Sequence, residues 1–320
     1  MQFSRRQWLR AGLASGAAAL AGPVIASAPI APVQGPGVYR SVLGSYQLTA
    51  LYDGLWRVKV DEHFVRNASA AQVDEALAAG FLPPRILPVS FTALLVNTGA
   101  KLVLIDTGTA GQITDSAGTL LANLAIAGVK PQAIDTILIS HFHPDHINGI
   151  RSKDGDKVFP NAEIAVPEGE WAYWMDDANM AGVSTTVRRY FLNARRIFRD
   201  IGGEVRRFEP GAEVAPGITS IPAFGHTPGH AAFAISSGNA SLLVISDSAR
   251  EPWLFVRHPE WQPSYDMDAA MAVETRRRLL DRAAADRMPV HGYHFPFPAM
   301  GHIARTATGY DLVPALWQPL

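Results

Sequence analysis

Residues 133–146, with the sequence AIDTILISHFHPDH, combine a short apolar segment with a dense polar ending. A nearly all-apolar run of this length is typical of a strand buried on both faces of a parallel sheet. Four side chains of metal-ligand type follow it within six positions: His141, His143, Asp145 and His146. Open α/β sheets bind their ligands at the carboxyl ends of such strands. The segment therefore predicts an α/β fold with a metal site at one edge of a sheet.

Three further apolar segments of the chain end in the same residue types, namely His226, Asp247 and His294. The sequence contains no cysteine, so a metal would have to be held by imidazole and carboxylate groups. These ligands suit zinc, iron, manganese or cobalt. Four strands that end in such residues are stronger evidence for a metal site than any single motif.

The order of the expected elements indicates two sheets. We expect a hairpin over 91–108 and helices over 120–130, 187–201 and 268–285. Strand-rich segments precede helices twice along the chain, which favours two sheets packed together with helices outside. A chain of 320 residues that is 48% hydrophobic is long enough to bury one large core.

The charge of the chain excludes one class of partner. The formal net charge is −1 and no long basic segment is present, so the chain lacks the electrostatic footprint of a nucleic-acid-binding protein. We therefore expect a small molecule, and no nucleic acid, as the binding partner.

The first 28 residues differ in character from the rest of the chain. SRRQWLR carries Arg5 and Arg6, and residues 11–28 form an uncharged stretch of small residues that ends in Ala-Ser-Ala. This pattern resembles a twin-arginine export signal, and the stretch is too weakly hydrophobic for a stable membrane span. We expect a signal peptide over 1–28, a linker over 29–38 and a single domain over 39–320. The mature protein would then be periplasmic or secreted.

The sequence HFHPDH resembles the metal-binding signature of the metallo-β-lactamase superfamily. LIDTG (104–108) and GHTPGH (225–230) are similar to further motifs of that superfamily, and Asp247 and His294 follow in the same order. Within the superfamily, the segments 38–54, 95–111 and 294–303 are most similar to the methyl parathion hydrolase branch. The resemblance implies a four-layer αββα sandwich that forms a single domain.

The resemblance also implies two divalent metal ions per chain, most naturally Zn²⁺. The first ion would be bound by His141, His143 and His226. The second would be bound by Asp145, His146 and His294. Asp247 would bridge the two ions, so that Asp145 and Asp247 are the expected catalytic carboxylates. A hydroxide shared by the two ions would be the nucleophile.

Other residues near these motifs have supporting roles in this interpretation. Asp106 is expected to hydrogen-bond a metal ligand from outside, and His230 is expected to be structural. His291 competes with His294 for the last ligand position, and we prefer His294 because it lies at the end of its strand. Phe142 and Trp174 are expected to line the substrate pocket.

The predicted function is the metal-dependent hydrolysis of a small apolar ester: an organophosphate triester, an aryl ester or a lactone. An N-acyl-homoserine lactonase is the main alternative, although such enzymes carry a tyrosine where this chain has Arg250. A β-lactam hydrolase, a diiron oxidoreductase and a non-catalytic metal-binding protein are further alternatives. The oxidoreductases carry glutamate at the position of His143. A homodimer is compatible with each of these functions.

Overall fold

The computed structural model describes residues 34–320. The predicted signal peptide and the first part of the predicted linker lie outside the described residues, and the first strand begins at Val38. Residues 36–320 form one compact unit. Within the part of the chain that is described, no helix combines the length and the apolar character needed to cross a membrane.

The first of two seven-stranded sheets contains β1 to β7 in chain order. Its strands β1 to β4 pair antiparallel and β4 to β7 pair parallel. The strands are β1 (Val38–Leu43), β2 (Tyr46–Lys59), β3 (Ile86–Asn97), β4 (Leu102–Ile105), β5 (Thr136–Leu138), β6 (Glu163–Pro167) and β7 (Arg206–Phe208). All three residues of β5 are buried, as expected for an inner strand of the parallel part.

In the second sheet, β8 to β14 are also neighbours in chain order, so that β8 and β14 are its edges. Only β11 and β12 pair parallel among its described neighbours. The strands are β8 (Glu213–Ala215), β9 (Ile218–Pro222), β10 (Ala231–Ser237), β11 (Ala240–Val244), β12 (Pro289–His291), β13 (Met300–Arg305) and β14 (Tyr310–Pro314).

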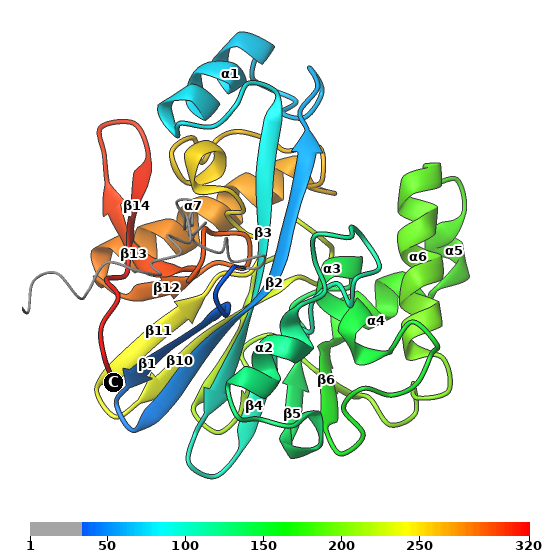
Figure 1. Ribbon diagram of the computed structural model, residues 1–320. Helices are drawn as coiled ribbons and strands as arrows, with labels where there is room; N and C mark the ends of the chain where they lie inside the picture. The colour runs from blue at the N-terminus through cyan, green and yellow to red at the C-terminus, as the bar shows by residue number, and fades with distance from the viewer. Residues whose placement is uncertain (1–33) are drawn as a thin grey trace, which may run out of the picture. The chain divides into compact units, whose positions relative to one another are not determined.

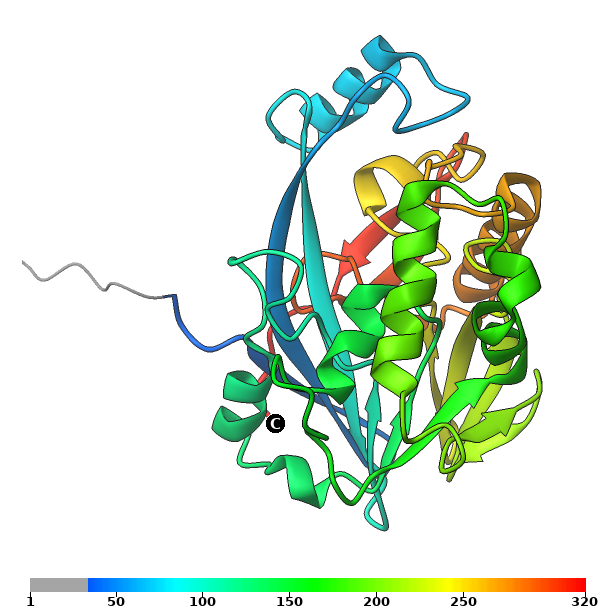
Figure 2. The same cartoon turned by 90° about the vertical axis from the view of Figure 1, so that its right-hand side faces the viewer.

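Helices cover the outer faces of both sheets, and the first helix lies beyond the end of the β2–β3 hairpin (Figures 1 and 2). They are α1 (Ala70–Ala79), α2 (Leu120–Ile126), α3 (Pro144–Ile147), α4 (Glu168–Met175), α5 (Asp177–Met180), α6 (Thr185–Phe198) and α7 (Ala269–Ala285). Short 3₁₀ or π segments are η1 (Pro131–Ala133), η2 (Asn148–Ile150) and η3 (Pro252–Val256). Helices α2, α4 and α6 pack on the first sheet, and α7 packs on the second.

The side chains of each strand alternate between two cores, because successive residues of a strand point to opposite faces. In β4, Val103 and Ile105 lie in the core between the sheets, whereas Leu104 packs under the helices. In β11, Val244 lies between the sheets and Leu243 packs against α7. The layers are therefore helix, sheet, sheet and helix, which confirms the predicted αββα sandwich.

Most of the expected elements are present with shifted ends. The hairpin over 91–108 is formed by β3 and β4. The helix expected over 120–130 ends earlier, at Ile126, and Gly128 follows with φ +76°, a conformation that favours glycine. The helix expected over 187–201 begins two residues earlier, because the Ser184 side chain caps it through the Val187 N–H.

Candidate metal centre

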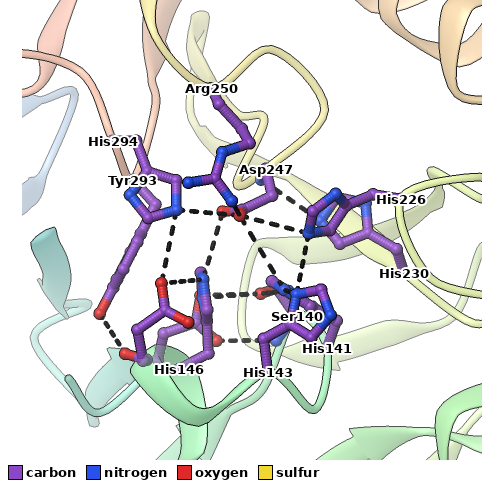
Figure 3. A network of polar contacts seen from close by, with 12 residues as sticks. Ser140, His141, His143, His146, His226, His230, Asp247, Arg250, Tyr293 and His294 are labelled. Atoms are coloured by element: carbon purple, nitrogen blue, oxygen red, sulfur yellow. Dashed lines mark hydrogen bonds and ion pairs between the residues drawn. The ribbon is translucent and has the colours of Figure 1, made fainter. Parts of the chain in front are cut away.

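The seven predicted ligands come from four loops that follow strands of both sheets. His141, His143, Asp145 and His146 follow β5, and Pro144 begins the short helix α3. Proline at the first helical position is pre-organised for that turn, and the turn brings Asp145 and His146 to the same side as the preceding histidines. From the second sheet, His226 lies between β9 and β10, Asp247 follows β11, and His294 follows β12. Figure 3 shows the labelled members of this set facing a common centre.

His141, His143 and His226 form one group of converging nitrogens. The Nδ1 atom of His143 lies 3.0 Å from Nε2 of His141 and 3.0 Å from Nε2 of His226. Burial lowers the pKa of His141 and His143 well below the ordinary histidine value. Both rings are therefore neutral at pH 7 and carry lone pairs that can bind a cation.

Asp145, His146 and His294 form a second group. The Oδ2 atom of Asp145 lies 3.4 Å from Nε2 of His146 and 3.5 Å from Nε2 of His294. The side chains of both histidines are fully buried, and that of Asp145 is 15% exposed. The second group is therefore close to solvent on the Asp145 side.

Asp247 lies between the two groups. Its Oδ2 atom is 2.9 Å from Nε2 of His294 and 3.4 Å from Nε2 of His226, and its Oδ1 atom is 3.2 Å from Nε2 of His146. Burial raises the pKa of Asp247, but the neighbouring His294 and His146 together lower it by more. The net pKa of Asp247 is therefore well below the ordinary value. Asp247 is thus an ionised carboxylate that reaches both groups.

The donor set fits divalent metal ions. Among the described residues, the buried atoms Nε2 of His146 and Oδ1 of Asp247 have no hydrogen-bond partner. Buried polar atoms are normally hydrogen-bonded, and bound cations would satisfy these two atoms as well as the converging nitrogens. Imidazole and carboxylate groups without sulfur suit zinc and similar transition metals.

Contacts outside the cluster fix the orientation of the histidine rings. His146 Nδ1 lies 2.8 Å from Asp106 Oδ2, and His294 Nδ1 lies 2.8 Å from the backbone oxygen of Ser90. His226 Nδ1 lies 2.9 Å from Asp266 Oδ1. Such partners select the ring tautomer and hold the ligand in place.

Asp106 holds the loop after β5 at three points. Its carboxylate also accepts hydrogen bonds from the backbone N–H and the hydroxyl of Ser140, each at 2.8 Å. The backbone of Asp106 has φ +59°, an uncommon conformation for a residue other than glycine. These contacts place Asp106 where the sequence analysis expected a supporting residue.

Asp266 and Glu170 are two supporting acids that the sequence analysis did not single out. Asp266 Oδ2 accepts a hydrogen bond of 2.8 Å from the buried Arg276. Arg276 also donates to the backbone oxygens of Ser248, Pro259 and Trp261. The loop around Asp266 carries no sequence signal for this role, because its partners are distant in the chain.

Glu170 connects the ligand loops of the two sheets. Its fully buried carboxylate accepts hydrogen bonds of 2.8 Å each from the Phe142 N–H, the Gly229 N–H and the Trp174 indole N–H. Phe142 lies between two ligand histidines of the first sheet, and Gly229 lies in the loop of His226. A signal was present in the sequence, because Glu170 shares a helical face with Trp174 four residues later.

His230 and His291 lie near the cluster but outside its two groups. His230 Nδ1 is 2.8 Å from the backbone oxygen of Ala223, and its Nε2 accepts the Asp247 N–H at 3.3 Å. His291 ends β12, and burial lowers its pKa to about 3. Neither ring nitrogen of His291 has a hydrogen-bond partner among the described residues. The structure therefore brings His294 into the cluster and leaves His291 inside the second sheet.

Phe142 and Trp174 do not line the cavity beside the cluster, contrary to the expectation from the sequence. Both are fully buried in the core under the helices. The ring centres of Phe142 and Phe198 are 4.6 Å apart and those of Trp174 and Phe191 are 4.7 Å apart, with the rings of each pair tilted to each other. Both rings pack among the aromatic side chains under the helices, and the Trp174 ring lies edge to face with that of His143, with 6.3 Å between the ring centres.

Two cavities of about 440 and 450 Å³ adjoin the cluster at His143. Tyr190 and Tyr265 line both cavities. The first cavity also borders Asp145, and its apolar lining comes from Trp56, Val89, Phe91 and Ile113. The space beside the candidate metal centre is therefore large enough for a small organic molecule.

The sequence profile of the Metallo-beta-lactamase superfamily matches residues 88–291, and the chain belongs to this superfamily. The fold, the His/Asp cluster and the superfamily together identify a metal-dependent hydrolase.

Solved structures similar to this chain include a hydrolase, a lactonase and a probable hydrolase. The hydrolase AbOPH of the beta lactamase superfamily is 29% identical, with a TM-score of 0.84 over 90% of this chain and 100% of that chain. AidC, a dizinc quorum-quenching lactonase, is 27% identical, with a TM-score of 0.83 over 88% of this chain and 99% of that chain. A probable metal-dependent hydrolase from Staphylococcus aureus is 19% identical, with a TM-score of 0.71 over 86% of this chain and 100% of that chain, which shows the shared fold.

His291 at the end of β12 and His294 in the loop that follows can be compared as a matched pair. We expect His294→Ala to lose about one bound ion per chain, because the second group would keep too few ligands. His291→Ala should retain metal like the unchanged protein. Metal content after dialysis measures this difference, with circular dichroism as the check on folding. Metal loss in His291→Ala but not in His294→Ala would show that His291 is the ligand.

Glu170 can be tested against Glu168, a partly exposed acid on the same helix. In Glu170→Gln the amide nitrogen cannot accept a hydrogen bond, so at least one buried N–H loses its partner. We expect metal affinity to fall by about ten-fold, as for other residues that orient ligands. Glu168→Gln should leave it unchanged. Competition with a chromophoric chelator measures the affinity, and equal values for the two variants would refute the role of Glu170.

Proposed function

We propose that this protein is a dinuclear metal hydrolase of small esters and lactones, including organophosphate triesters. The observation that supports the proposal is the position of Asp247 between two groups of ligand-type side chains, beside a cavity with apolar walls. The similarity to the dizinc lactonase AidC and to the hydrolase AbOPH agrees with a reaction of this kind. Membership of the methyl parathion hydrolase branch is part of this proposal.

In this proposal His141, His143 and His226 hold one ion and Asp145, His146 and His294 hold the other. Asp247 would bind both ions, and its negative charge would offset the repulsion between them. Two divalent ions, which we propose to be zinc, would supply Lewis acidity and a nucleophilic hydroxide at neutral pH.

The chain's own hydroxyl groups would orient the substrate. Burial raises the pKa of Tyr190 to about 12 and also raises that of Tyr265. Both phenols are therefore protonated at pH 7 and can donate hydrogen bonds into the cavities that they line. A phenol that donates to an acyl or phosphoryl oxygen would hold the substrate next to Asp145.

The cavity favours small apolar esters over polymers. Its apolar wall, formed by Trp56, Val89, Phe91 and Ile113, matches the hydrocarbon part of such a substrate. Lactones are a specific candidate class, because AidC, which resembles this chain over 88% of its length, is a lactonase. Three positions after Asp247 this chain has Arg250, whereas the N-acyl-homoserine lactonases described in the sequence analysis have tyrosine there. This difference favours other esters and lactones over N-acyl-homoserine lactones.

A substrate panel tests this function. We expect the zinc-loaded protein to hydrolyse a dialkyl 4-nitrophenyl phosphate, a 4-nitrophenyl alkanoate or an N-acyl-homoserine lactone. It should be far less active towards bis(4-nitrophenyl) phosphate, because the negative charge of a phosphodiester repels an attacking hydroxide. Removal of the ions by a chelator should lower the rate by at least about 100-fold, and zinc should restore it. Hydrolysis of the diester alone would refute the proposal.

We also propose that the protein is exported, which places the reaction outside the cytoplasm. Arg5 and Arg6 and the weakly apolar stretch that follows them support this proposal. Replacing both arginines with lysine should retain the precursor in the cytoplasm, as measured by cell fractionation. Unchanged export of that variant would contradict the twin-arginine route.

A further inference from the structure

Arg250 is a buried cation on the wall of the cavity next to the metal centre. It follows Asp247 by three positions, is 8% exposed, and lines the cavity together with His143 and Asp145. A guanidinium is not deprotonated in proteins. Arg250 therefore keeps its positive charge in the cavity wall. Figure 3 shows its side chain directed at Asp247 between His294 and His226.

The hydrogen-bonding capacity of Arg250 is only partly used. Its Nη1 atom is 3.4 Å from Asp247 Oδ2 and its Nη2 atom is 3.2 Å from Glu251 Oε1. Both distances exceed the roughly 2.7–2.9 Å of a strong charge-assisted bond. The buried Nε atom has no partner among the described residues. A guanidinium carries about five N–H donors, and beyond these two contacts Nη1 and Nη2 each keep one further N–H for a ligand in the cavity.

The guanidinium is held in place although its donors are not saturated. It lies 4.6 Å from the ring centre of Tyr265, over the ring face, and Glu251 is fully buried beside it. In the proposed metal-loaded centre, Asp247 would serve the ions, which leaves Glu251 as the main carboxylate partner of Arg250. The position of the cation is thus fixed by Tyr265 and Glu251.

The charges on the cavity wall favour an anion. Apart from Asp145, a candidate metal ligand, the charged side chains that line this cavity are Arg189 and Arg250. A third arginine, Arg196, donates hydrogen bonds of 2.9 and 2.8 Å to the lining residues Gln112 and Asn193. The apolar wall described above completes a cavity with a hydrocarbon side and a cationic side.

We propose that the substrate is an ester or lactone that also carries a carboxylate, and that Arg250 binds this carboxylate. The inference rests on the proposed hydrolase function and names its substrate class. A neutral ester oxygen needs a single donor, which Tyr190 or Tyr265 can supply. A planar guanidinium with several free donors matches the two oxygens of a carboxylate. Arg189 at the exposed side of the cavity attracts the same anion.

Two matched esters test the proposal. 4-Nitrophenyl hexanoate and the 4-nitrophenyl monoester of adipic acid differ only by a carboxylate in place of the terminal methyl group. We expect the zinc-loaded protein to prefer the adipate ester by at least about ten-fold in kcat/KM, equivalent to about 1.4 kcal/mol. Arg250→Gln should abolish this preference, mainly through a higher KM for the adipate ester. Bound metal is measured in each preparation, because Arg250 contacts Asp247.

Three control variants separate binding from structural effects. If Arg250 only neutralises Glu251, the double variant Arg250→Gln with Glu251→Gln should regain the preference, and that result would overturn the proposal. If the double variant still lacks the preference for the adipate ester, the result supports carboxylate binding by Arg250. Arg189→Gln should weaken the preference and its dependence on salt, whereas Arg188→Gln, an exposed neighbour outside the cavity lining, should not.

The remaining outcomes are also decisive. An equal loss of kcat/KM for both esters in Arg250→Gln, or no preference in the unchanged protein, would overturn the role of Arg250 while leaving the hydrolase function intact. If neither ester is hydrolysed, the proposed function fails for this class of ester, and calorimetry with adipate then tests Arg250 alone. Binding of adipate that is lost in Arg250→Gln supports the inference, and binding equal in both proteins refutes it.

Discussion

The arrangement of the whole site depends on one electrostatic constraint, the burial of the Asp247 carboxylate among histidines whose lone pairs converge. An ionised carboxylate is costly to bury unless it is paired, and the neutral rings of His141 and His143 direct lone pairs into the same space. Bound cations would pair with the carboxylate and would also accept the nitrogen lone pairs. The polypeptide must therefore hold these groups in place, and the outer contacts of the site are explained by this requirement.

Those outer contacts come from elements that are far apart in the sequence. Asp106 orients His146 from the end of β4, while Asp266 orients His226 from the segment before α7. Asp266 is itself held by Arg276, whose guanidinium also fixes three backbone oxygens of the neighbouring loops. The ring orientations are thus determined by tertiary structure, and the ligand motifs alone would not define them.

The sequence was sufficient for the parts of the protein that depend on local pattern. The apolar run before His141 and the order of strand-rich and helical segments predicted the layers, and strand endings in His and Asp predicted which loops meet. Asp266 could not be predicted, because its partners His226 and Arg276 are brought to it only by the packing of α7. Phe142 and Trp174 were misplaced, because an aromatic residue near a motif can face either the cavity or the core. Only the tertiary structure shows whether such a residue faces the cavity or the core.

The proposed metal ligands are shared between the two sheets, four from the first and three from the second, and Glu170 adds a further link between their loops. Any sliding of one sheet over the other would separate His143 from His226 and would weaken metal binding. By thermodynamic linkage, the free energy of metal binding then also stabilises the docking of the sheets. The ions would act as a cross-link between the halves of a chain that has no cysteine for a disulfide. Wall residues that would hold no ion, such as Ile113, could then differ with the substrate without a loss of cohesion between the sheets.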